Sequence, residues 1–379
     1  MSIRLRAEKA GGSMKKIISA GHICLDITPV FPAGKQYDSL SSLLVPGRLI
    51  QMEAADVHTG GSVANTGLAL KLLGCDVTLM GKVGDDSFGM MIRNILAGYG
   101  AGGLLVDPAG STSYSVVLAV PGLDRVFLHS PGANDTFTGT DIPEEALEEA
   151  ILFHFGYPPL MRRTWENDGT ELVSLFRRMK QKGIATSLDL AAVDPNSPAG
   201  KADWQKILSA VLPYVDFFVP SFEELCWMLD RKRYDRLAAE GRDMTDSLDV
   251  EKEALPLAEQ LLAMGSRIVV IKCGTSGMLL RTGGKSSVSG IGSRLELDTD
   301  AWSSRTVLQP CFKADIVRSG AGAGDTSIAA FLAAVLSGRK PEDCVALACA
   351  EGACCVTTYD TLSGLKPLDK LEERIRRGW

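Results

Sequence analysis

Short apolar runs alternate with longer amphipathic stretches along most of the chain, and this alternation predicts strands followed by helices. Runs such as KKIISAGHICLD at 15–26, ILFHFG at 151–156 and RIVVIKCG at 267–274 are typical of strands buried in a parallel sheet. Helical patterns follow most of them and often stop at a glycine. We therefore expect an α/β fold with a mainly parallel central sheet.

Two segments break this rhythm. Residues 28–58 contain several Pro, Gly and Ser and lack a helical period, and residues 110–134 alternate like an antiparallel hairpin that turns near 122–124. We interpret the two together as a small β-structured flap. Residues 283–305 are rich in Gly and Ser and are interpreted as a surface loop.

The stretch DIVRSGAGAGDTSIAAFLAAVLSG at 315–338 places a glycine-rich turn before an unbroken apolar helix. Backbone N–H groups of Gly322, Ala323 and Gly324 would point out of the helix start, with the positive end of the helix dipole behind them, which attracts phosphate. The carboxylate of Asp325 would repel phosphate unless it accepts a proton from an attacking hydroxyl. A capping role for Asp325 in a tight turn also fits the motif.

Polar residues in the first third of the chain are further candidates. Asp26 follows the first apolar run, at the position where open α/β sheets keep their ligands. Gly60 and Gly61 form a flexible turn before a helix at 62–73, whose first turn carries Asn65. Local turn or capping roles are the alternatives for Asp26 and Asn65.

Composition narrows the function classes. The chain has 379 residues, 45% of them hydrophobic, which is enough for a large core, and its net charge of -6 argues against a general nucleic-acid binder. No apolar run of membrane-spanning length occurs, and residues 1–13 lack the apolar core of a signal peptide. We expect a disordered tail at 1–13 and no membrane partner. Nine cysteines without a CxxC pair and four widely spaced histidines favour reduced thiols in the cytoplasm and no zinc site.

Motifs of other enzyme classes are incomplete or absent in this sequence. GGKSS at 283–287 resembles the end of a P-loop, but Leu279 stands where that motif needs glycine. GAGAGD resembles a dinucleotide fingerprint, but Asp325 replaces its last glycine, so a Rossmann dehydrogenase is the weaker interpretation. No GxSxG motif of a serine hydrolase occurs.

Five motifs in order, GGSVANTGLALKLLG, GKVGDDSFG, PSFEEL, KCGTSG and GAGAGD, resemble the ribokinase family, the phosphofructokinase-B type of carbohydrate kinases. The resemblance covers roughly residues 15–365. It implies a ribokinase-like three-layer α/β/α kinase domain over 14–379, with lid segments at about 28–58 and 110–134 forming a small β-sheet lid.

The resemblance also implies roles for particular residues. Asp325 would be the catalytic base, and the Gly322, Ala323 and Gly324 amides would form an anion hole. The sugar would contact Asp26, Gly60, Gly61 and Asn65, the nucleotide would contact Lys272, Gly274, Thr275 and Gly277, and Glu224 would act near Mg²⁺.

Two departures from the family pattern affect the cofactors. Ser319 stands where many members have an acidic residue, which puts a potassium site in doubt. Ser221 stands where many have asparagine, so we expect magnesium handling through Glu224 in altered form. ATP and Mg²⁺ are the cofactors that the resemblance implies.

The sequence therefore predicts an ATP-dependent kinase that phosphorylates a hydroxyl of a small sugar or sugar-like substrate. Two alternatives stay open: a nucleoside kinase of the same family, and a sugar-binding regulatory protein with weak or no turnover. The hairpin at 113–130 carries apolar residues on both faces, which favours a homodimer through the lid or packing of the hairpin on the main body.

Overall fold

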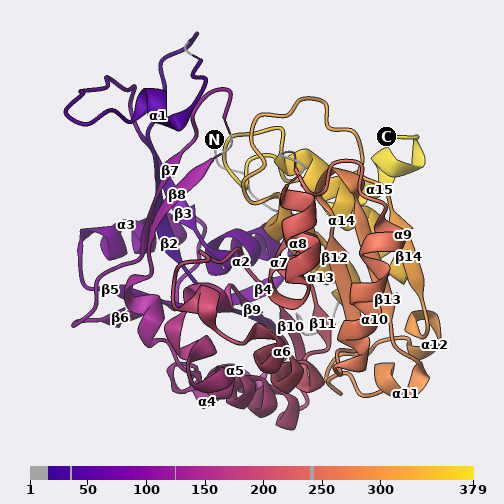
Figure 1. The fold of residues 1–379 in the computed structure, drawn as a ribbon. Helices are drawn as coiled ribbons and strands as arrows, with labels where there is room; N and C mark the ends of the chain where they lie inside the picture. Colours follow the sequence, from indigo (N-terminus) through magenta and orange to yellow (C-terminus); the bar gives the residue numbers. More distant parts are fainter. Residues whose placement is uncertain (1–15, 35, 124, 240–242) are drawn as a thin grey trace.

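A computed structural model describes residues 16–34, 36–123, 125–239 and 243–379. The tail expected at 1–13 lies outside these residues. Figure 1 shows a large α/β body from which a smaller sheet projects.

The central sheet has eight strands in the order β14-β13-β12-β11-β10-β9-β1-β4. Neighbouring strands pair in parallel from β4 to β12, whereas β13 and β14 are antiparallel to their neighbours. The mainly parallel sheet expected from the sequence is confirmed. Its strands are β1 (Lys16–Gly21), β4 (Asp76–Met80), β9 (Ala150–Gly156), β10 (Ala185–Leu188), β11 (Phe217–Phe218), β12 (Ile268–Lys272), β13 (Met278–Thr282) and β14 (Thr306–Gln309).

Helices cover both faces of this sheet, because successive side chains of each buried strand point to opposite sides. Ile17 belongs to a core formed with α2, α13 and α14, and its neighbour Ile18 belongs to a second core formed with α5, α6, α7 and α10. The result is three layers. The helices are α2 (Ser62–Leu72), α5 (Arg162–Gln181), α6 (Trp204–Val211), α7 (Phe222–Leu229), α10 (Leu255–Ala263), α13 (Ala323–Leu336) and α14 (Pro341–Cys355).

The structure has further α-helices besides these. They are α1 (Leu40–Leu43), α3 (Ser87–Gly98), α4 (Glu144–Glu148), α8 (Arg231–Ala238), α9 (Val250–Glu253), α11 (Lys285–Val288), α12 (Thr299–Trp302) and α15 (Leu368–Arg376). No helix among the described residues is both long and apolar enough to cross a membrane.

The expectation of one strand across 15–26 is wrong. The chain turns at Gly21, whose φ is +126° and where a Cβ would lie 2.3 Å from the carbonyl oxygen of Gly156. Beyond this turn, β2 (Cys24–Thr28) leaves the central sheet. Asp26 is therefore not a residue that follows a buried strand of the central sheet, but a residue within a strand of the smaller one.

The smaller sheet has four strands in the order β3-β2-β7-β8. It joins β3 (Asp56–Gly60) to β7 (Tyr114–Leu118) and β8 (Val126–Ser130), and the β7–β8 pair is the antiparallel hairpin that the alternation predicted. Two further strands, β5 (Lys82–Gly84) and β6 (Leu105–Asp107), pair beside it. α1 lies in a segment that extends beyond the smaller sheet, at the upper left of Figure 1.

The interpretation of 283–305 as a surface loop is wrong in part. The segment contains α11 and α12, and Trp302 at the end of α12 is 1% exposed. Its ring packs edge-on against Phe217 and Phe331. Trp302, with the buried side chains of Val288, Ile291 and Leu295, anchors a segment whose composition is otherwise polar.

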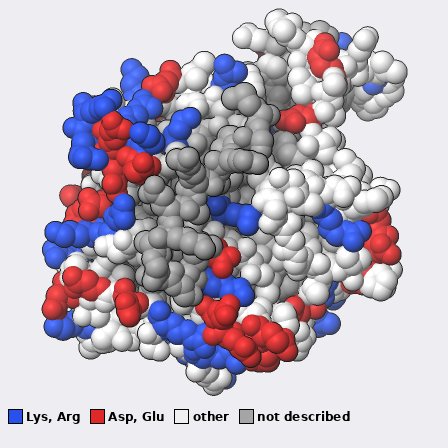
Figure 2. All heavy atoms as spheres, turned by 180° about the vertical axis from the view of Figure 1, so that it is seen from behind, with Lys and Arg blue, Asp and Glu red and all other residues white. Residues whose placement is uncertain are grey.

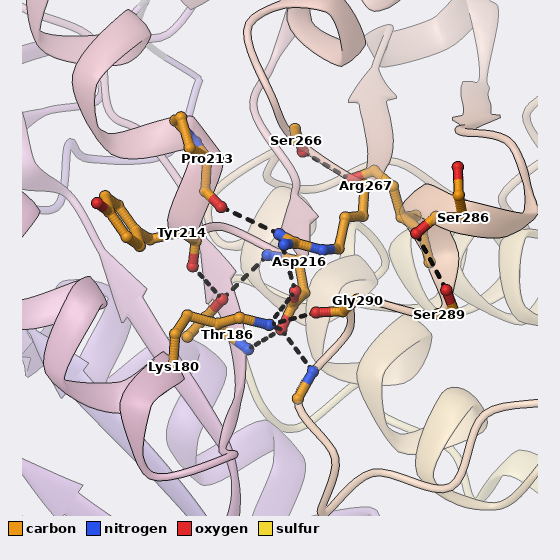
Figure 3. A network of polar contacts seen from close by, with 12 residues as sticks. Lys180, Thr186, Pro213, Tyr214, Asp216, Ser266, Arg267, Ser286, Ser289 and Gly290 are labelled. Carbon is orange, nitrogen blue, oxygen red and sulfur yellow. Dashed lines mark hydrogen bonds and ion pairs between the residues drawn. The ribbon is translucent and has the colours of Figure 1, made fainter.

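The amino ends of the central strands are held by a buried ion network, shown in Figure 3. Asp216, which precedes β11, accepts hydrogen bonds from Lys180 Nζ at 2.7 and 2.9 Å and lies 3.3 Å from Arg267 Nη1. The amides of Thr186 and Gly292 also donate to this carboxylate. Because the carboxylate is fully paired, we assign the network to stability, since removing one partner would leave a buried charge.

Candidate active site

The carboxylate of Asp325 lies in the first turn of α13 and is 4% exposed. Its Oδ2 accepts a hydrogen bond from Asn65 Nδ2 at 3.1 Å, and its Oδ1 accepts one from Thr66 Oγ1 at 3.2 Å. Both donors belong to α2, which packs beside α13 in the same core. The structure thus brings together Asp325 and Asn65, two residues from opposite ends of the chain.

The turn before α13 has the backbone geometry that favours anions. Gly322 is in the left-handed region with φ +72°, and a Cβ there would lie 2.2 Å from Thr361 Cγ2, so a side chain is excluded. The Ala323 amide donates to Gly320 at 3.4 Å, but the Gly322 and Gly324 amides have no hydrogen-bond partner among the described residues. Two of the three amides expected in an anion hole are thus available to a ligand.

An ammonium group lies beside these amides. Lys272, at the end of β12, places Nζ 2.7 Å from Asp189 Oδ1; the Asp189 side chain is buried and that of Lys272 is 13% exposed. A Cβ on Gly324 would lie 3.6 Å from the same Nζ. Burial alone would lower the pKa of Lys272, but the neighbouring carboxylates of Asp189, Glu224 and Asp325 outweigh it and raise this pKa, so the side chain is cationic.

Glu224 forms a capping box at the start of α7. Its Oε2 accepts a hydrogen bond from the Ser221 amide at 2.7 Å, and its own amide donates to Ser221 Oγ at 3.3 Å. Its charge also acts on Lys272 and Asp189. Ser221 therefore supports the helix start that carries Glu224 towards the ion pair.

The glycines at 60 and 61 are required by the side chains packed against them. A Cβ on Gly60 would lie 2.1 Å from Asp26 Oδ2, and one on Gly61, where φ is +85°, would lie 2.7 Å from His22 Nδ1. Burial raises the pKa of Asp26, and the charge of Asp325 adds to this effect. Asp26 and Asp325 therefore lie close enough to influence each other.

Three residues of the site were missed from the sequence: Thr66, Tyr157 and Asp189. Tyr157 follows β9 and has φ +68°, which is unusual for a residue other than glycine. Its hydroxyl donates to both carboxylate oxygens of Asp325, at 2.9 and 2.8 Å. Tyr157 and Asp189 both follow central strands at the edge where α/β proteins bind ligands, and that position was the signal available.

The four residues expected to contact the nucleotide lie in different parts of the structure. Thr275 lines a pocket of about 440 Å³ between the start of α9 and the end of β14. Gly274 and Gly277, with φ +51° and +99°, form the turn beside this pocket. Lys272 instead faces the start of α13. The pocket beside Thr275 and the Lys272 ammonium group therefore lie in separate parts of the site.

Among the described residues, no group of three or more His, Cys, Asp and Glu side chains is placed to hold a metal ion. Asp189 and Glu224 are two carboxylates near the unpaired amides, and hard oxygen ligands of this kind suit Mg²⁺ that keeps waters and phosphate oxygens as its other ligands. The Oγ of Ser319 accepts a hydrogen bond from the Ala321 amide at 3.2 Å. Position 319 therefore offers a neutral oxygen in a turn.

Comparison with known proteins gives concordant matches. The family model described as pfkB family carbohydrate kinase matches residues 16–367. Fructokinase-2 of Oryza sativa subsp. japonica is 26% identical over 59% of this chain and 62% of its own length. The chain thus spans less than two thirds of this relative. The ATP-dependent ribose-1-phosphate kinase of Halopiger xanaduensis is 25% identical over 90% of this chain and 91% of its own length.

Solved structures share the fold. Fructokinase with bound ATP from Xylella fastidiosa superposes with a TM-score of 0.69 at 18% identity, over 97% of this chain and 99% of that one. Arabidopsis thaliana ribokinase complexed with ribose and ATP gives a TM-score of 0.68 at 18% identity, over 95% and 98%. The ribokinase-like fold expected from the motifs is confirmed. With the family model matching nearly the whole described chain, this protein belongs to the pfkB family of carbohydrate kinases.

Proposed function

We propose that this protein transfers the γ-phosphoryl group of ATP to a hydroxyl of a small sugar or sugar-like substrate. The observation that carries the proposal is the position of Asp325, which lies in the first turn of α13 beside unpaired amides and is hydrogen-bonded to Asn65. A base and an anion-binding helix start at one point are what phosphoryl transfer to an alcohol needs.

In this mechanism the acceptor hydroxyl approaches Asp325 and replaces the contact that Tyr157 makes. The hydroxyl oxygen forms a bond to the γ-phosphorus, the bond from that phosphorus to the bridging oxygen of ADP breaks, and the hydroxyl proton moves to an Asp325 oxygen. Asn65 and Thr66 hold the carboxylate in place during this step. The Gly322 and Gly324 amides and the Lys272 ammonium stabilise the charge on the phosphoryl oxygens.

ATP would extend from the pocket beside Thr275 to the start of α13. The pocket beside Thr275 has a volume typical of small-ligand sites and would hold the nucleoside end, and the start of α13 would hold the phosphates. Glu224 and Asp189 would hold magnesium through its waters, and the ion would neutralise the phosphates when bound. Gly274 and Gly277 would let the backbone approach the nucleotide.

The smaller sheet would act as a lid, with the segments at about 28–58 and 110–134 covering the acceptor. A contact supports this role: a Cβ on Gly320 would lie 3.5 Å from Arg125 Nη2, so the tip of the β7–β8 hairpin reaches the glycine-rich turn before α13. A lid in that position would exclude water from the phosphoryl group.

We further propose a homodimer through this lid. The segment that extends from it exposes Leu44, Val45 and Leu49, with Leu49 89% exposed, and Figure 2 shows the projection at its upper right as largely uncharged. Exposed apolar groups on a projection favour burial against a second copy. A dimeric mass by light scattering at micromolar concentration, reduced to a monomeric mass by Leu49→Asp, supports this, and a monomeric wild type contradicts it.

The kinase function is tested by ADP release in the presence of Mg²⁺, with pentoses, hexoses, sugar acids and nucleosides as acceptors, with and without potassium. We expect turnover with a sugar. Turnover with nucleosides alone would identify a nucleoside kinase, and tight sugar binding without ATP consumption would identify a regulatory protein. Figure 2 shows acidic and basic side chains interspersed over its coloured surface, which supports small-molecule partners rather than nucleic acid.

A further inference from the structure

Two histidines that are distant in sequence, His58 and His129, lie in one row of the smaller sheet. Register pairs Asp26 with His58 on one side and with Ser115 on the other, and it pairs Ser115 with His129. Directly paired residues of adjacent strands point to the same face of a sheet. His58, Asp26, Ser115 and His129 therefore form one transverse row, which we call the polar row.

The polar row is connected to the proposed base. Ser115 Oγ lies 3.0 Å from His129 Nδ1, and the His129 ring lies 5.1 Å from the ring of His22. The His22 ring stacks on Tyr157 with a centroid distance of 6.0 Å, and Tyr157 donates to Asp325. The rings of His22 and Tyr157 therefore connect the polar row to Asp325.

Three ring nitrogens in this arrangement are buried without a hydrogen-bond partner among the described residues, and one of them, His58 Nδ1, lies 3.5 Å from Asp56 Oδ2. The other two are His129 Nε2 and His22 Nδ1. A buried polar atom without a partner destabilises the fold, so such atoms call for a ligand or water. Neutral imidazole offers one donor and one acceptor, which matches a hydroxyl group.

The charges around the row are unfavourable for an anion. Asp26 and Asp325 are two carboxylates on the acceptor side, and burial lowers the pKa of both His22 and His129, which keeps these rings neutral. Lys272 is already paired with Asp189. Arg125 lies four residues before His129, about 14 Å away along β8, and its end reaches Gly320.

We propose that the polar row, with His129 as its specificity-determining residue, binds the hydroxyl groups of an uncharged polyol acceptor and discriminates against phosphorylated or carboxylated sugars. The inference rests on the proposed kinase function. His129 Nε2 bonds an acceptor hydroxyl, Asp26 accepts from another, and Ser115 fixes the His129 ring through Nδ1.

The test compares uncharged and anionic acceptors on the wild-type enzyme. D-fructose, D-ribose and inosine are the uncharged probes, and fructose 6-phosphate, ribose 1-phosphate and gluconate are the anionic ones. At about 6 Å and an effective dielectric constant of about 20, one added like charge lowers kcat/KM about 100-fold. Preference for fructose, ribose or inosine supports the inference, and the preferred probe shows which kind of uncharged acceptor the enzyme uses. Preference for an anionic probe overturns it and points to Arg125 as the partner.

Variants at His129 test the assigned residue. His129→Phe keeps a ring but removes both nitrogens, and we expect kcat/KM for the preferred uncharged acceptor to fall about tenfold with KM for ATP unchanged. His129→Gln retains an amide near the position of Nε2 and should recover most of that loss. Ser130→Ala alters the next residue, which points to the opposite face of β8, and should change neither constant.

Several results would overturn the role of His129. The first is an unchanged kcat/KM for the acceptor in His129→Phe. The second is an equal loss of kcat/KM in Ser130→Ala, and the third is a rise in KM for ATP in His129→Phe that parallels the loss for the acceptor. Should His129→Phe not fold, Ser115→Ala removes the contact that orients the ring and should reduce kcat/KM for the acceptor alone. If no acceptor is phosphorylated, the proposed function fails, and calorimetric titration with D-fructose then tests the polar row by itself: no binding to the wild type overturns it.

Discussion

The hydroxyl of Tyr157 lies 2.9 and 2.8 Å from the two carboxylate oxygens of Asp325, between the oxygens that would receive an acceptor proton. With Asn65 and Thr66 it surrounds the carboxylate with donors. An ionised carboxylate accepts such bonds readily, and they hold it in one orientation. On the proposed mechanism, Tyr157 would therefore occupy the place that the substrate hydroxyl takes.

Tyr157→Phe tests this relationship. The variant keeps the ring that stacks on His22 but leaves space for a water molecule at the base, so we expect ATP hydrolysis without acceptor to rise about tenfold. The measurement is ADP release with no sugar present. Hydrolysis at the wild-type rate would show that Tyr157 does not exclude water from Asp325. Tyr114→Phe, on the opposite face of the smaller sheet, is the matched control and should leave hydrolysis unchanged.

Lys272 and Asp189 form a buried ion pair, so stability and turnover have to be measured together. Lys272→Met leaves an unpaired buried carboxylate and should cost about 3–5 kcal/mol in the free energy of unfolding. Lys272→Met combined with Asp189→Asn should recover most of that stability. Turnover should stay low in the double variant, because the ammonium beside Gly324 is still missing. Recovery of both properties together would limit the pair to a structural role.

Glu351 gives the fold a pH dependence outside the site. It lies in α14 with 0% exposure; Oε1 accepts from the Lys366 amide at 2.9 Å, and burial raises the pKa of Glu351 to about 7. Because this pKa is raised on folding, its contribution to stability is complete below about pH 4.5 and is lost as pH rises through about 7.

Glu351→Gln should therefore reduce the loss of stability between pH 5 and 8, by up to about 3 kcal/mol. The glutamine oxygen can still accept from Lys366, so the contact is kept while the charge is removed. Urea unfolding of both proteins at the two pH values measures the difference. Equal pH dependence in variant and wild type would show that Glu351 titrates normally. Glu342→Gln, on the same helix but exposed, is the control.

The pattern of apolar residues predicted those strands and helices whose apolar runs fit only one kind of element. The buried runs became β1, β9 and β12, and the uniformly apolar stretch became α13 against α14. The break after Gly21 was missed because the residues on both sides of it are apolar, so no change of pattern marks the passage from one sheet to the other. The burial of Trp302 was missed because a few apolar residues do not alter the polar average of 283–305.

The candidate site shows a similar limit. Glycines and a carboxylate at a helix start pointed to Asp325, and a polar side chain in the first turn of the helix after Gly60 and Gly61 pointed to Asn65. Tyr157 and Asp189 are single residues after buried strands, and which side chain turns into the site depends on backbone angles such as φ +68° at Tyr157. The polar row depends on strand register across the smaller sheet, which the sequence alone did not provide.

The most direct test of the account is the turnover of Asp325→Asn with the preferred sugar, with ATP affinity measured by calorimetry on the same preparation. Asparagine has similar shape but cannot accept the proton, so we predict a loss of about 10² to 10⁴ in kcat with ATP affinity unchanged. A kcat close to that of the wild type would show that Asp325 is not the base, and the proposed mechanism would be wrong.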